Sequence, residues 1–380
     1  MKYRNFGNTG EMVSTLGFGC MRLPEVELNE KWYIDEDKAL PLLFKAYESG
    51  INYFDSAPYY CHKNSEYAVG KALKSVRDKI KLTTKLPFED VKKPSDMRRI
   101  LENSLKKMDT DYIDFYHFWG LNKGSLDNIK SNDLFNEARK AKEEGLIKHL
   151  SFSFHDEPSN MIDIIDAGEG IFESVLCQYN LLDRANESSI AYAKKKGLGI
   201  AAMGPVAGGR LAAPTELFKK LTGKESIATY ELALRFVLGN EDISIALSGM
   251  QNMDMLEKNL AIANVDTYMT KSEWDKISIA MEEIKKFSEL YCTGCNYCQP
   301  CPANIDIPKI FNMYTYHNVY GLTGAAKSEF EEYKNNPDKG ALPESCINCG
   351  MCESKCPQHL KIRDELKRVV MVLEAIKAEN

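Results

Sequence analysis

Apolar and polar residues alternate on two length scales through the first three quarters of the chain. Short runs rich in β-branched and aromatic residues resemble strands, and the longer stretches between them repeat apolar residues at helical spacing. The predicted strands are Thr15–Met21, Asn52–Asp55, Lys81–Lys85, Tyr112–Phe118, Leu150–Phe154, Ser174–Tyr179, Gly199–Met203 and Ile243–Ser248. The predicted helices are Asp37–Ser49, Ser65–Val76, Ser95–Lys107, Leu134–Glu144, Pro158–Ala167, Glu187–Lys196, Ile227–Leu238 and Met253–Leu260. Successive strand–helix units predict an α/β fold, a (β/α)8 TIM barrel.

A doubly wound open sheet is the alternative arrangement of such units. A sheet of that kind that binds a dinucleotide carries a G-x-G-x-x-G motif after its first strand, and no such motif follows Thr15–Met21. Gly145, Gly197 and Gly239 lie where helices should end before the next strand, as helix-terminating glycines do. The pattern therefore favours the barrel.

Most of the 11 cysteines fall in two runs near the C-terminal end. The runs are Cys292-x2-Cys295-x2-Cys298-x2-Cys301-Pro302 and Cys346-x2-Cys349-x2-Cys352-x3-Cys356-Pro357. They resemble the C-x2-C-x2-C-x3-C-P run of bacterial two-cluster ferredoxins, in which the fourth cysteine ligates the other cluster. The resemblance implies two [4Fe–4S] clusters with crossed ligation. The ligands of cluster one would be Cys292, Cys295, Cys298 and Cys356, and those of cluster two Cys346, Cys349, Cys352 and Cys301.

Two other uses of these cysteines are open alternatives. Structural zinc takes two C-x2-C pairs per ion, whereas each run carries four closely spaced cysteines. Disulfides form in oxidising compartments, and the first residues do not resemble a signal peptide. Both observations favour clusters. Cys20, Cys61 and Cys177 lie outside the runs, and we expect them to be small buried hydrophobes in a reducing compartment.

The composition changes near residue 286, just before the first cysteine run. We therefore divide the chain into a barrel at residues 1–285 and a second domain at residues 286–380. The segment between the two runs is long for a compact β-rich ferredoxin, and its helical pattern predicts a small, mainly α-helical ferredoxin-like domain. The helices expected there are Ile307–Tyr316, Thr323–Asn335 and Leu360–Lys377.

Composition and charge narrow the possible partners. Of the 380 residues, 44% are hydrophobic and 27% are charged, which is usual for a soluble globular protein. The net charge of −6 argues against a nucleic-acid surface as the main role. No apolar run reaches membrane-spanning length, and the opening residues lack the apolar segment of a signal peptide. We therefore expect a cytoplasmic protein without a nucleic-acid or membrane partner.

Polar side chains follow three successive predicted strands. Asp55 and Tyr60 follow the second strand, and Lys85 ends the third. His117 lies near the end of the fourth. Catalytic groups of barrels collect at these strand ends. A lysine there needs a carboxylate partner, and it can lower the pKa of a nearby tyrosine so that the hydroxyl donates a proton near neutral pH. Packing could explain each residue alone, but together they are candidate catalytic groups.

Several stretches of the chain resemble the aldo-keto reductase family. They are Tyr3–Gly10, Val13–Gly19, Asp55-Ser56-Ala57 with Tyr60, Thr84-Lys85, Gln178-Tyr179-Asn180, and Ser248-Gly249-Met250 through Asn259. With the cysteine runs added, the chain looks like the iron–sulfur-containing branch of that family. The resemblance implies a barrel that binds NADH or NADPH extended across its mouth and passes hydride to a substrate carbonyl.

The resemblance also implies roles for individual residues. Tyr60 would donate the proton, Lys85 would lower its pKa, and Asp55 would hold the lysine.

Further residues match the family's cofactor contacts. Ser153 and Gln178 match the residues that bind the nicotinamide carboxamide. The backbone of Gly204–Leu211 and Gly249–Asn252 matches the loops that hold the pyrophosphate, and Asn259 matches an adenine contact.

The chain departs from the family at several of these positions. Trp119 stands where the family has a strand-four histidine, and it should face the substrate beside the nicotinamide. His117 lies two residues earlier and would reach the site only if the strand end is shifted or bulged. Met203 replaces an aromatic residue that stacks on the nicotinamide. Met255 replaces the basic residue that binds the 2′-phosphate of NADPH, and Lys258 is the nearest cation, which favours NADH.

Two classes of function follow from these features. The first is an NAD(P)H-dependent reductase of small aldehydes or ketones. Its clusters would either exchange electrons with a redox partner protein or have a structural role, in which they hold the second domain rigidly closed over the barrel. The alternative is an electron-transfer iron–sulfur protein whose barrel has lost hydride-transfer activity. The strand-end residues Asp55, Tyr60 and Lys85 favour the first, whereas Trp119 favours the second.

Overall fold

The computed structural model describes residues 1–181, 183–206, 229–284, 290, 292, 294–318 and 323–376. Their contacts form two compact units, of which the first contains residues 1–206 and 231–270. The second unit contains residues 229–230 and the described residues from 271 onward, so that helix α11 (Lys271–Ile284) groups with it. The domain boundary expected at residue 285 stays a prediction.

The first unit is a closed barrel of eight parallel strands, as predicted. The strand order around the barrel follows the order along the chain. The strands are β3 (Leu16–Gly19), β6 (Tyr53–Asp55), β7 (Lys81–Leu86), β8 (Ile113–Leu121), β9 (Ile147–Phe154), β10 (Ser174–Gln178), β11 (Gly199–Met203) and β12 (Ile245–Gly249). Each predicted strand overlaps one of these, because strands buried on both faces are continuous apolar runs in the sequence.

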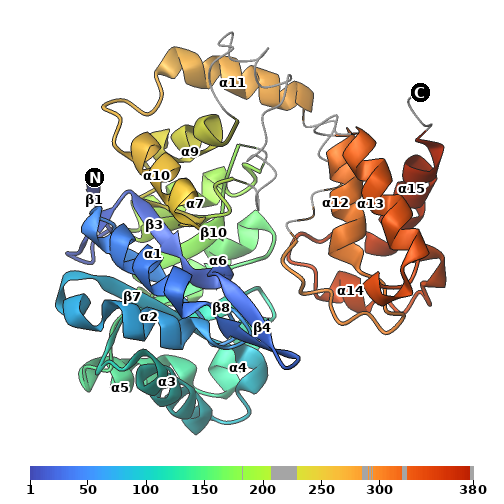
Figure 1. Cartoon of the computed structure of the whole chain (residues 1–380). Helices are drawn as coiled ribbons and strands as arrows, with labels where there is room; N and C mark the ends of the chain where they lie inside the picture. The colour runs from blue at the N-terminus through green and yellow to red at the C-terminus, as the bar shows by residue number, and fades with distance from the viewer. Residues whose placement is uncertain are drawn as a thin grey trace. The chain divides into compact units, whose positions relative to one another are not determined.

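Helices surround the strands, as Figure 1 shows for the elements coloured from blue to yellow. They are α1 (Glu36–Glu48), α2 (Ser65–Leu73), α3 (Pro94–Met108), α4 (Ser125–Ser131), α5 (Leu134–Glu143), α6 (Pro158–Ala167), α7 (Glu187–Lys195), α9 (Thr229–Gly239) and α10 (Met253–Ala263). Each of the eight predicted helices overlaps one of these, and residues 227–228 of the predicted Ile227–Leu238 lie outside the described residues. The short α4 was not predicted, because its seven residues include a single fully buried side chain.

An N-terminal hairpin of β1 (Tyr3–Asn5) and β2 (Met12–Ser14) precedes the barrel. Phe6 follows β1, is fully buried, and packs edge-on against Phe115 of β8 with ring centroids 4.9 Å apart. Gly199, the first residue of β11, leaves room for this ring, because a Cβ there would lie 2.4 Å from it. Phe6 therefore fills the end of the barrel where the strands begin. Catalytic residues of such barrels lie at the opposite end, where the strands finish.

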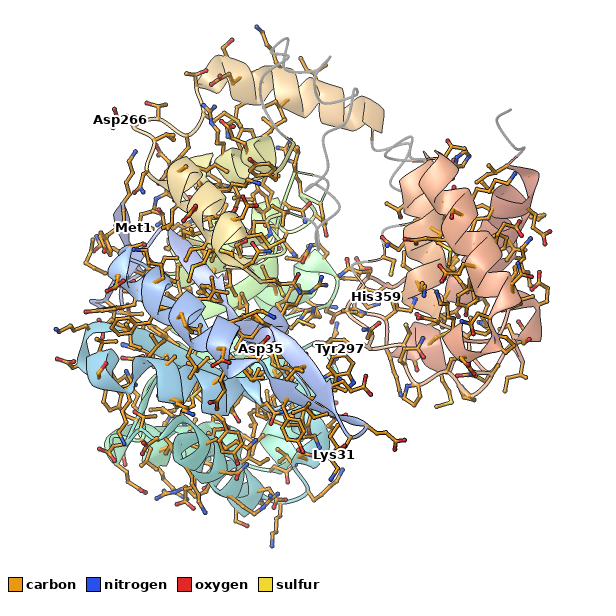
Figure 2. All side chains as sticks on the ribbon, in the orientation of Figure 1. Met1, Lys31, Asp35, Asp266, Tyr297 and His359 are labelled. Atoms are coloured by element: carbon orange, nitrogen blue, oxygen red, sulfur yellow. The ribbon has the colours of Figure 1, made fainter. Side chains whose placement is uncertain are left out.

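A second hairpin, of β4 (Glu25–Leu28) and β5 (Lys31–Ile34), lies between β3 and α1. Figure 2 shows Lys31 at this hairpin and Asp35 where α1 begins. Trp32 is 43% exposed and its ring stacks on His62, with ring centroids 5.4 Å apart. The hairpin follows the C-terminal end of β3, so it stands on the side of the barrel where the strands finish.

The second unit contains α-helices and short 3-10 turns among its described residues, as predicted for this part of the chain. Its helices after α11 are α12 (Ile307–Asn318), α13 (Thr323–Asn335), α14 (Met351–Ser354) and α15 (Ile362–Ala375). Phe311, Phe330 and Val369 belong to its buried core, and several cysteines pack against that core. None of the described helices combines the length and apolarity needed to cross a membrane.

Candidate functional site

Asp55 and Lys85 form a buried ion pair at the ends of β6 and β7. The Lys85 Nζ lies 2.8 Å from Asp55 Oδ1 and 2.7 Å from Asp55 Oδ2. It also donates to the carbonyl oxygen of Ser56 at 2.8 Å. The two charged side chains are 1% and 2% exposed. Because a buried ammonium is costly without partners, these three acceptors explain how Lys85 can end an apolar strand.

The charge of this pair is set by opposing effects. Burial lowers the pKa of Lys85, and the Asp55 carboxylate raises it. Thr83, two residues before Lys85 on β7, donates a hydrogen bond from Oγ1 to Asp55 Oδ1 at 2.6 Å. Asp55 therefore holds the lysine and is itself fixed from the neighbouring strand, which gives Lys85 one defined position.

Tyr60 lies beside the ion pair, as predicted. The Lys85 Nζ is 4.7 Å from the centroid of the Tyr60 ring, and the tyrosine side chain is partly exposed. The chain after it is unusual, because Cys61, His62 and Lys63 all have positive φ angles of 50°, 51° and 72°. Non-glycine residues rarely adopt this conformation. This left-handed turn begins immediately after Tyr60 and helps fix its position over Lys85.

Trp119 also contacts Tyr60. The two rings are edge-on at 88°, with centroids 5.8 Å apart. Trp119 lies in a bulge of β8, since Phe118 pairs with Phe152 and Leu121 pairs with Phe154, which leaves one extra residue on β8. Trp119 is therefore at the mouth, and the interruption of the ladder comes after His117, not before it.

His117 lies below the mouth of the barrel. It pairs in register with Lys85 on one side and with Ser151 on the other, and it is 0% exposed. Its Nε2 is 3.4 Å from the Tyr53 hydroxyl and 3.9 Å from Asp55 Oδ1. Burial and the Lys85 charge lower the pKa of His117 to about 4. Burial and the Lys85 charge thus leave this imidazole neutral. It is enclosed in the barrel and offers no exposed surface to a substrate, and its catalytic role stays a prediction.

The enclosed His117 should make the protein sensitive to acid. In the folded protein its pKa of about 4 is below the ordinary value of 6.5. As the pH falls, this histidine is therefore protonated in the unfolded chain before it is protonated in the folded protein. Stability is therefore lost progressively below pH 6.5. We expect the free energy of unfolding to fall by about 2 kcal/mol between pH 7 and pH 5 from this residue. Urea unfolding at several pH values measures it, and His117→Asn should flatten the profile by that amount. An unchanged profile in the variant would contradict the assignment.

His155 is a mouth residue that the sequence interpretation did not include. It directly follows β9, and its backbone N–H donates to the Leu121 carbonyl at 3.3 Å. Its side chain is partly exposed. Burial, and next the charge of Lys85, lower its pKa to about 4. Strand alternation from Ser153 could have identified it, because residues two apart on a strand face the same side.

Two of the predicted nicotinamide contacts, Gln178 and Met203, lie together at the ends of β10 and β11, beside Gly204 of a predicted pyrophosphate loop. Gln178 pairs in register with Met203, and Gly204 follows Met203 with a φ of +65°. A Cβ on Gly204 would lie 2.8 Å from Gln178 Oε1, so the glycine permits a close approach. Ser153 is buried nearby on β9, and its Oγ accepts a hydrogen bond from the Gly120 N–H at 2.7 Å. Of the predicted segment Gly204–Leu211, residues 207–211 lie outside the described residues.

The remaining predicted cofactor residues lie where β12 leads into α10. Asn252 caps α10, accepting a hydrogen bond from the Met255 N–H at 2.9 Å. Asn259 is buried and donates to the Ser248 hydroxyl at 3.1 Å. Lys258 Nζ pairs with Asp254 Oδ2 at 2.6 Å. Gly249 is exposed at the end of β12, beside Gly19 of β3, with which it pairs. Gly204 is half-buried and Gly249 is exposed, and the backbone of the two glycines fits an extended pyrophosphate crossing the mouth.

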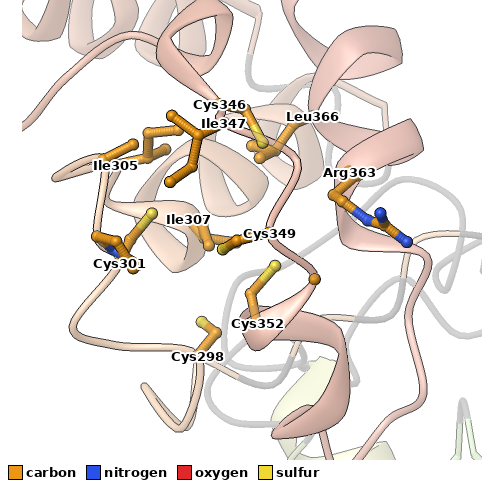
Figure 3. A pocket seen from close by; sticks show the side chains of 13 residues that line it. Cys298, Cys301, Ile305, Ile307, Cys346, Ile347, Cys349, Cys352, Arg363 and Leu366 are labelled. Carbon is orange, nitrogen blue, oxygen red and sulfur yellow. The ribbon is translucent and has the colours of Figure 1, made fainter.

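The eight cysteines of the second unit line two cavities. One cavity is lined by Cys292, Cys295, Cys298 and Cys356. The other is lined by Cys301, Cys346, Cys349 and Cys352, and Cys298 also reaches its wall. Figure 3 shows this second cavity, with the sulfurs of Cys301, Cys346, Cys349 and Cys352 coming from different sides. These groups are the two ligand sets expected for crossed ligation.

The chemistry of the first cysteine group fits a cluster. Burial raises the pKa of Cys298 to about 12, and the neighbouring Cys292, Cys295 and Cys356 contribute to the increase. Crowded sulfurs of this kind become thiolates when cations lie between them, and iron supplies those cations. No set of three His, Cys, Asp or Glu side chains in the described residues is placed as ligands of a single metal ion. Cys20, Cys61 and Cys177 are buried and free, as expected.

Comparison with known proteins agrees with both halves of this description. A model of the aldo/keto reductase family matches residues 15–282, and a model of a 4Fe-4S dicluster domain matches residues 291–362. The chain is 28% identical to L-galactose dehydrogenase of Arabidopsis thaliana over 76% of this chain and 97% of that protein. It is 26% identical to the uncharacterized oxidoreductase YqkF of Bacillus subtilis over 70% and 92% of the two chains. The solved aldo-keto reductase AKR11C1 from Bacillus halodurans, holo form, superposes with a TM-score of 0.63 at 26% identity, covering 74% of this chain and 96% of that one.

Proposed function

Because the chain belongs to the aldo/keto reductase family and carries a 4Fe-4S dicluster domain, we propose that it uses NADH or NADPH to reduce small aldehydes or ketones. The observation that carries this proposal is the buried Asp55–Lys85 pair beneath the partly exposed ring of Tyr60. That arrangement supplies a proton donor with a fixed cation beside it, which is what reduction of a carbonyl to an alcohol requires.

Asp55, Lys85 and Tyr60 have successive roles, from the buried ion pair outward to the partly exposed tyrosine. Asp55 keeps the Lys85 ammonium in place through two hydrogen bonds. Lys85 faces the Tyr60 ring and stabilises the negative charge that develops on the phenol oxygen as its proton leaves. Tyr60 then delivers that proton to the oxygen of the substrate. Trp119 walls the same space and, as an apolar ring, suits a small apolar carbonyl compound.

The nucleotide, when bound, supplies the hydride. Gln178 and Met203 would hold its nicotinamide end, Ser153 would support it from β9, and Gly204 would hold the pyrophosphate. Gly249 and the backbone that follows it as far as Asn252 would also hold the pyrophosphate. Asn259 would contact the adenine.

The start of α10 favours NADH over NADPH. A 2′-phosphate would approach its first turn, where Asp254 adds a negative charge and Met255 offers no cation. Lys258 is already paired with Asp254 at 2.6 Å. A phosphate needs strong cationic donors to replace its water, and this turn supplies a carboxylate instead.

We assign two [4Fe–4S] clusters to the second unit, held by the two cysteine groups that line its cavities. Such clusters supply one-electron storage, which suits exchange with a redox partner protein. Their thiol ligands must stay reduced until iron is bound, so we place the protein in the cytoplasm.

Hydride transfer can be tested with deuterium. Anaerobically purified protein is incubated with NADH deuterated at the reactive carbon and with propanal, benzaldehyde or methylglyoxal, and the product alcohol is examined by mass spectrometry. We expect deuterium in the product and tighter binding of NADH than of NADPH. L-Galactose with NAD⁺ is included in the reverse direction, because one relative is named for that reaction.

Nucleotide binding serves as the control for this experiment. Tryptophan fluorescence should be quenched by NADH, and Trp119→Phe should lose the quenching while calorimetry still detects binding. If neither nucleotide binds at millimolar concentration, the proposed function is wrong. The alternative, an electron-transfer protein with an inactive barrel, would then account for the clusters.

A further inference from the structure

The reaction leaves one role unassigned at the mouth of the barrel. A carbonyl oxygen that gains negative charge needs a second hydrogen-bond donor besides Tyr60. Trp119 occupies the strand-four position expected for an imidazole, and His117 is 0% exposed. The indole N–H of Trp119 is one candidate donor, and a neighbouring strand end supplies another.

Strand register brings His155 to that place. Ser151 pairs with His117, whose side chain faces the barrel interior near Asp55 and Tyr53. Residues two apart on a strand face the same side, so Ser153 and then His155 follow Ser151 upward toward the mouth. On the other side, Phe154 pairs with Cys177, which makes His155 the neighbour of Gln178 where β9 and β10 end.

The bulge in β8 opens space for this imidazole. Gly120, the residue after Trp119, has a φ of +67°. A Cβ placed on Gly120 would lie 4.0 Å from Cδ2 of His155, so the two residues are in contact distance. The backbone N–H of His155 is fixed to the Leu121 carbonyl at 3.3 Å. The imidazole thus stands next to Gly120, and the residue before Gly120, Trp119, contacts Tyr60.

The charge state of His155 suits a hydrogen-bond donor. Its pKa of about 4, lowered by burial and by the Lys85 ammonium, keeps the ring neutral at pH 7. A neutral imidazole carries one N–H donor, and such rings can polarise a carbonyl without giving up their proton. His155 therefore does not compete with Tyr60 as the acid.

We propose that His155, from the end of β9, donates a hydrogen bond to the carbonyl oxygen of the substrate while Tyr60 donates the proton. The inference rests on the proposed hydride transfer, and it moves the carbonyl-binding imidazole from the fourth barrel strand to the fifth. In each turnover the proton that reaches the oxygen comes from the Tyr60 hydroxyl, and the His155 N–H is retained.

Two measurements test His155, and one of them needs no turnover. The variants are His155→Ala, His155→Gln, which keeps an N–H donor, and the control His149→Gln, whose ring is bound to Glu173 at 2.8 Å near the start of β9. The first measurement is calorimetric binding of acetate, an oxyanion probe, to the full protein with NAD⁺. The second is kcat/KM for propanal with and without added imidazole. Nucleotide affinity and melting temperature are checked for each variant.

We expect His155→Ala to lower acetate affinity at least tenfold and kcat/KM about 10²-fold, with NADH affinity unchanged. Added imidazole should restore part of the activity, and His155→Gln should lose less. Equal acetate affinity and equal kcat/KM in His155→Ala and in the control would overturn the proposal. If the wild-type protein transfers no deuteride but its acetate binding still depends on His155, hydride transfer fails and the oxygen-binding role of His155 stands. A wild-type protein that neither binds acetate nor reduces a carbonyl overturns both.

Discussion

Replacing Tyr60 with phenylalanine should lower kcat for carbonyl reduction by about 10²–10⁴-fold, the usual contribution of a positioned general acid. The substitution removes only the hydroxyl, so the ring can keep its edge-on contact with Trp119 at 5.8 Å and its position 4.7 Å from the Lys85 ammonium. We therefore expect the affinity for NADH to stay within a few fold. Single-turnover kinetics with NADH and propanal separate the two quantities.

Tyr59 provides a matched control for this variant. It is the preceding residue, its ring also approaches Trp119 with centroids 5.5 Å apart, and its hydroxyl is bound to Asp90. Tyr59→Phe removes a hydroxyl from the same wall without touching the Asp55–Lys85 pair. Its kcat should remain within several fold of the wild-type value. A Tyr60→Phe enzyme as active as the Tyr59→Phe enzyme would show that another group supplies the proton.

Lys85 explains why the activity of Tyr60 should depend on residues that never meet the substrate. Its ammonium is 1% exposed and is balanced by Asp55, which Thr83 fixes in turn. Removal of one partner from such a buried pair leaves an uncompensated charge. Variants of Asp55 or Lys85 therefore combine a loss of stability with a loss of activity, and Tyr60→Phe is the cleaner test of the chemistry.

The barrel strands could be predicted because burial on both faces makes them continuous apolar runs. The two hairpins could not. The strands β1, β2, β4 and β5 are three or four residues long and mostly exposed or half-buried, so they show neither an apolar run nor a clean alternation. Hairpins of this kind are held by the protein around them, as Phe6 is held inside the barrel.

The sequence could predict which residue types form the candidate site, but not how deeply each side chain is buried in the barrel. Alternation places His117 and Trp119 on one side of β8, but only the register with Lys85 shows that His117 is enclosed. His155 was overlooked because the predicted strand ends at Phe154, one residue before it. The bulge at Trp119 and Gly120 depends on the backbone of β8, which no spacing of residue types reveals.

The second prediction with a large expected effect concerns which cysteines share a cluster. Each cavity is lined by cysteines from both runs. Cys356 belongs to the second run but lines the cavity of Cys292, Cys295 and Cys298. Cys301 belongs to the first run but lines the cavity of the second run. Loss of one ligand should prevent assembly of one cluster, so each single Cys→Ala variant should retain about half of the bound iron.

Double variants decide between crossed and sequential ligation. With crossed ligation, Cys295→Ala combined with Cys356→Ala removes two ligands of the same cluster, so about half of the iron should remain. Cys295→Ala combined with Cys301→Ala should instead abolish both clusters. Sequential ligation predicts the opposite outcome for each pair. Iron and sulfide content after anaerobic purification, with the absorbance of the clusters, measures the result. Both double variants share Cys295→Ala and differ only in the second cysteine. A general loss of folding would therefore lower the iron content of both to a similar extent. Crossed ligation instead leaves about half of the iron in one variant and none in the other.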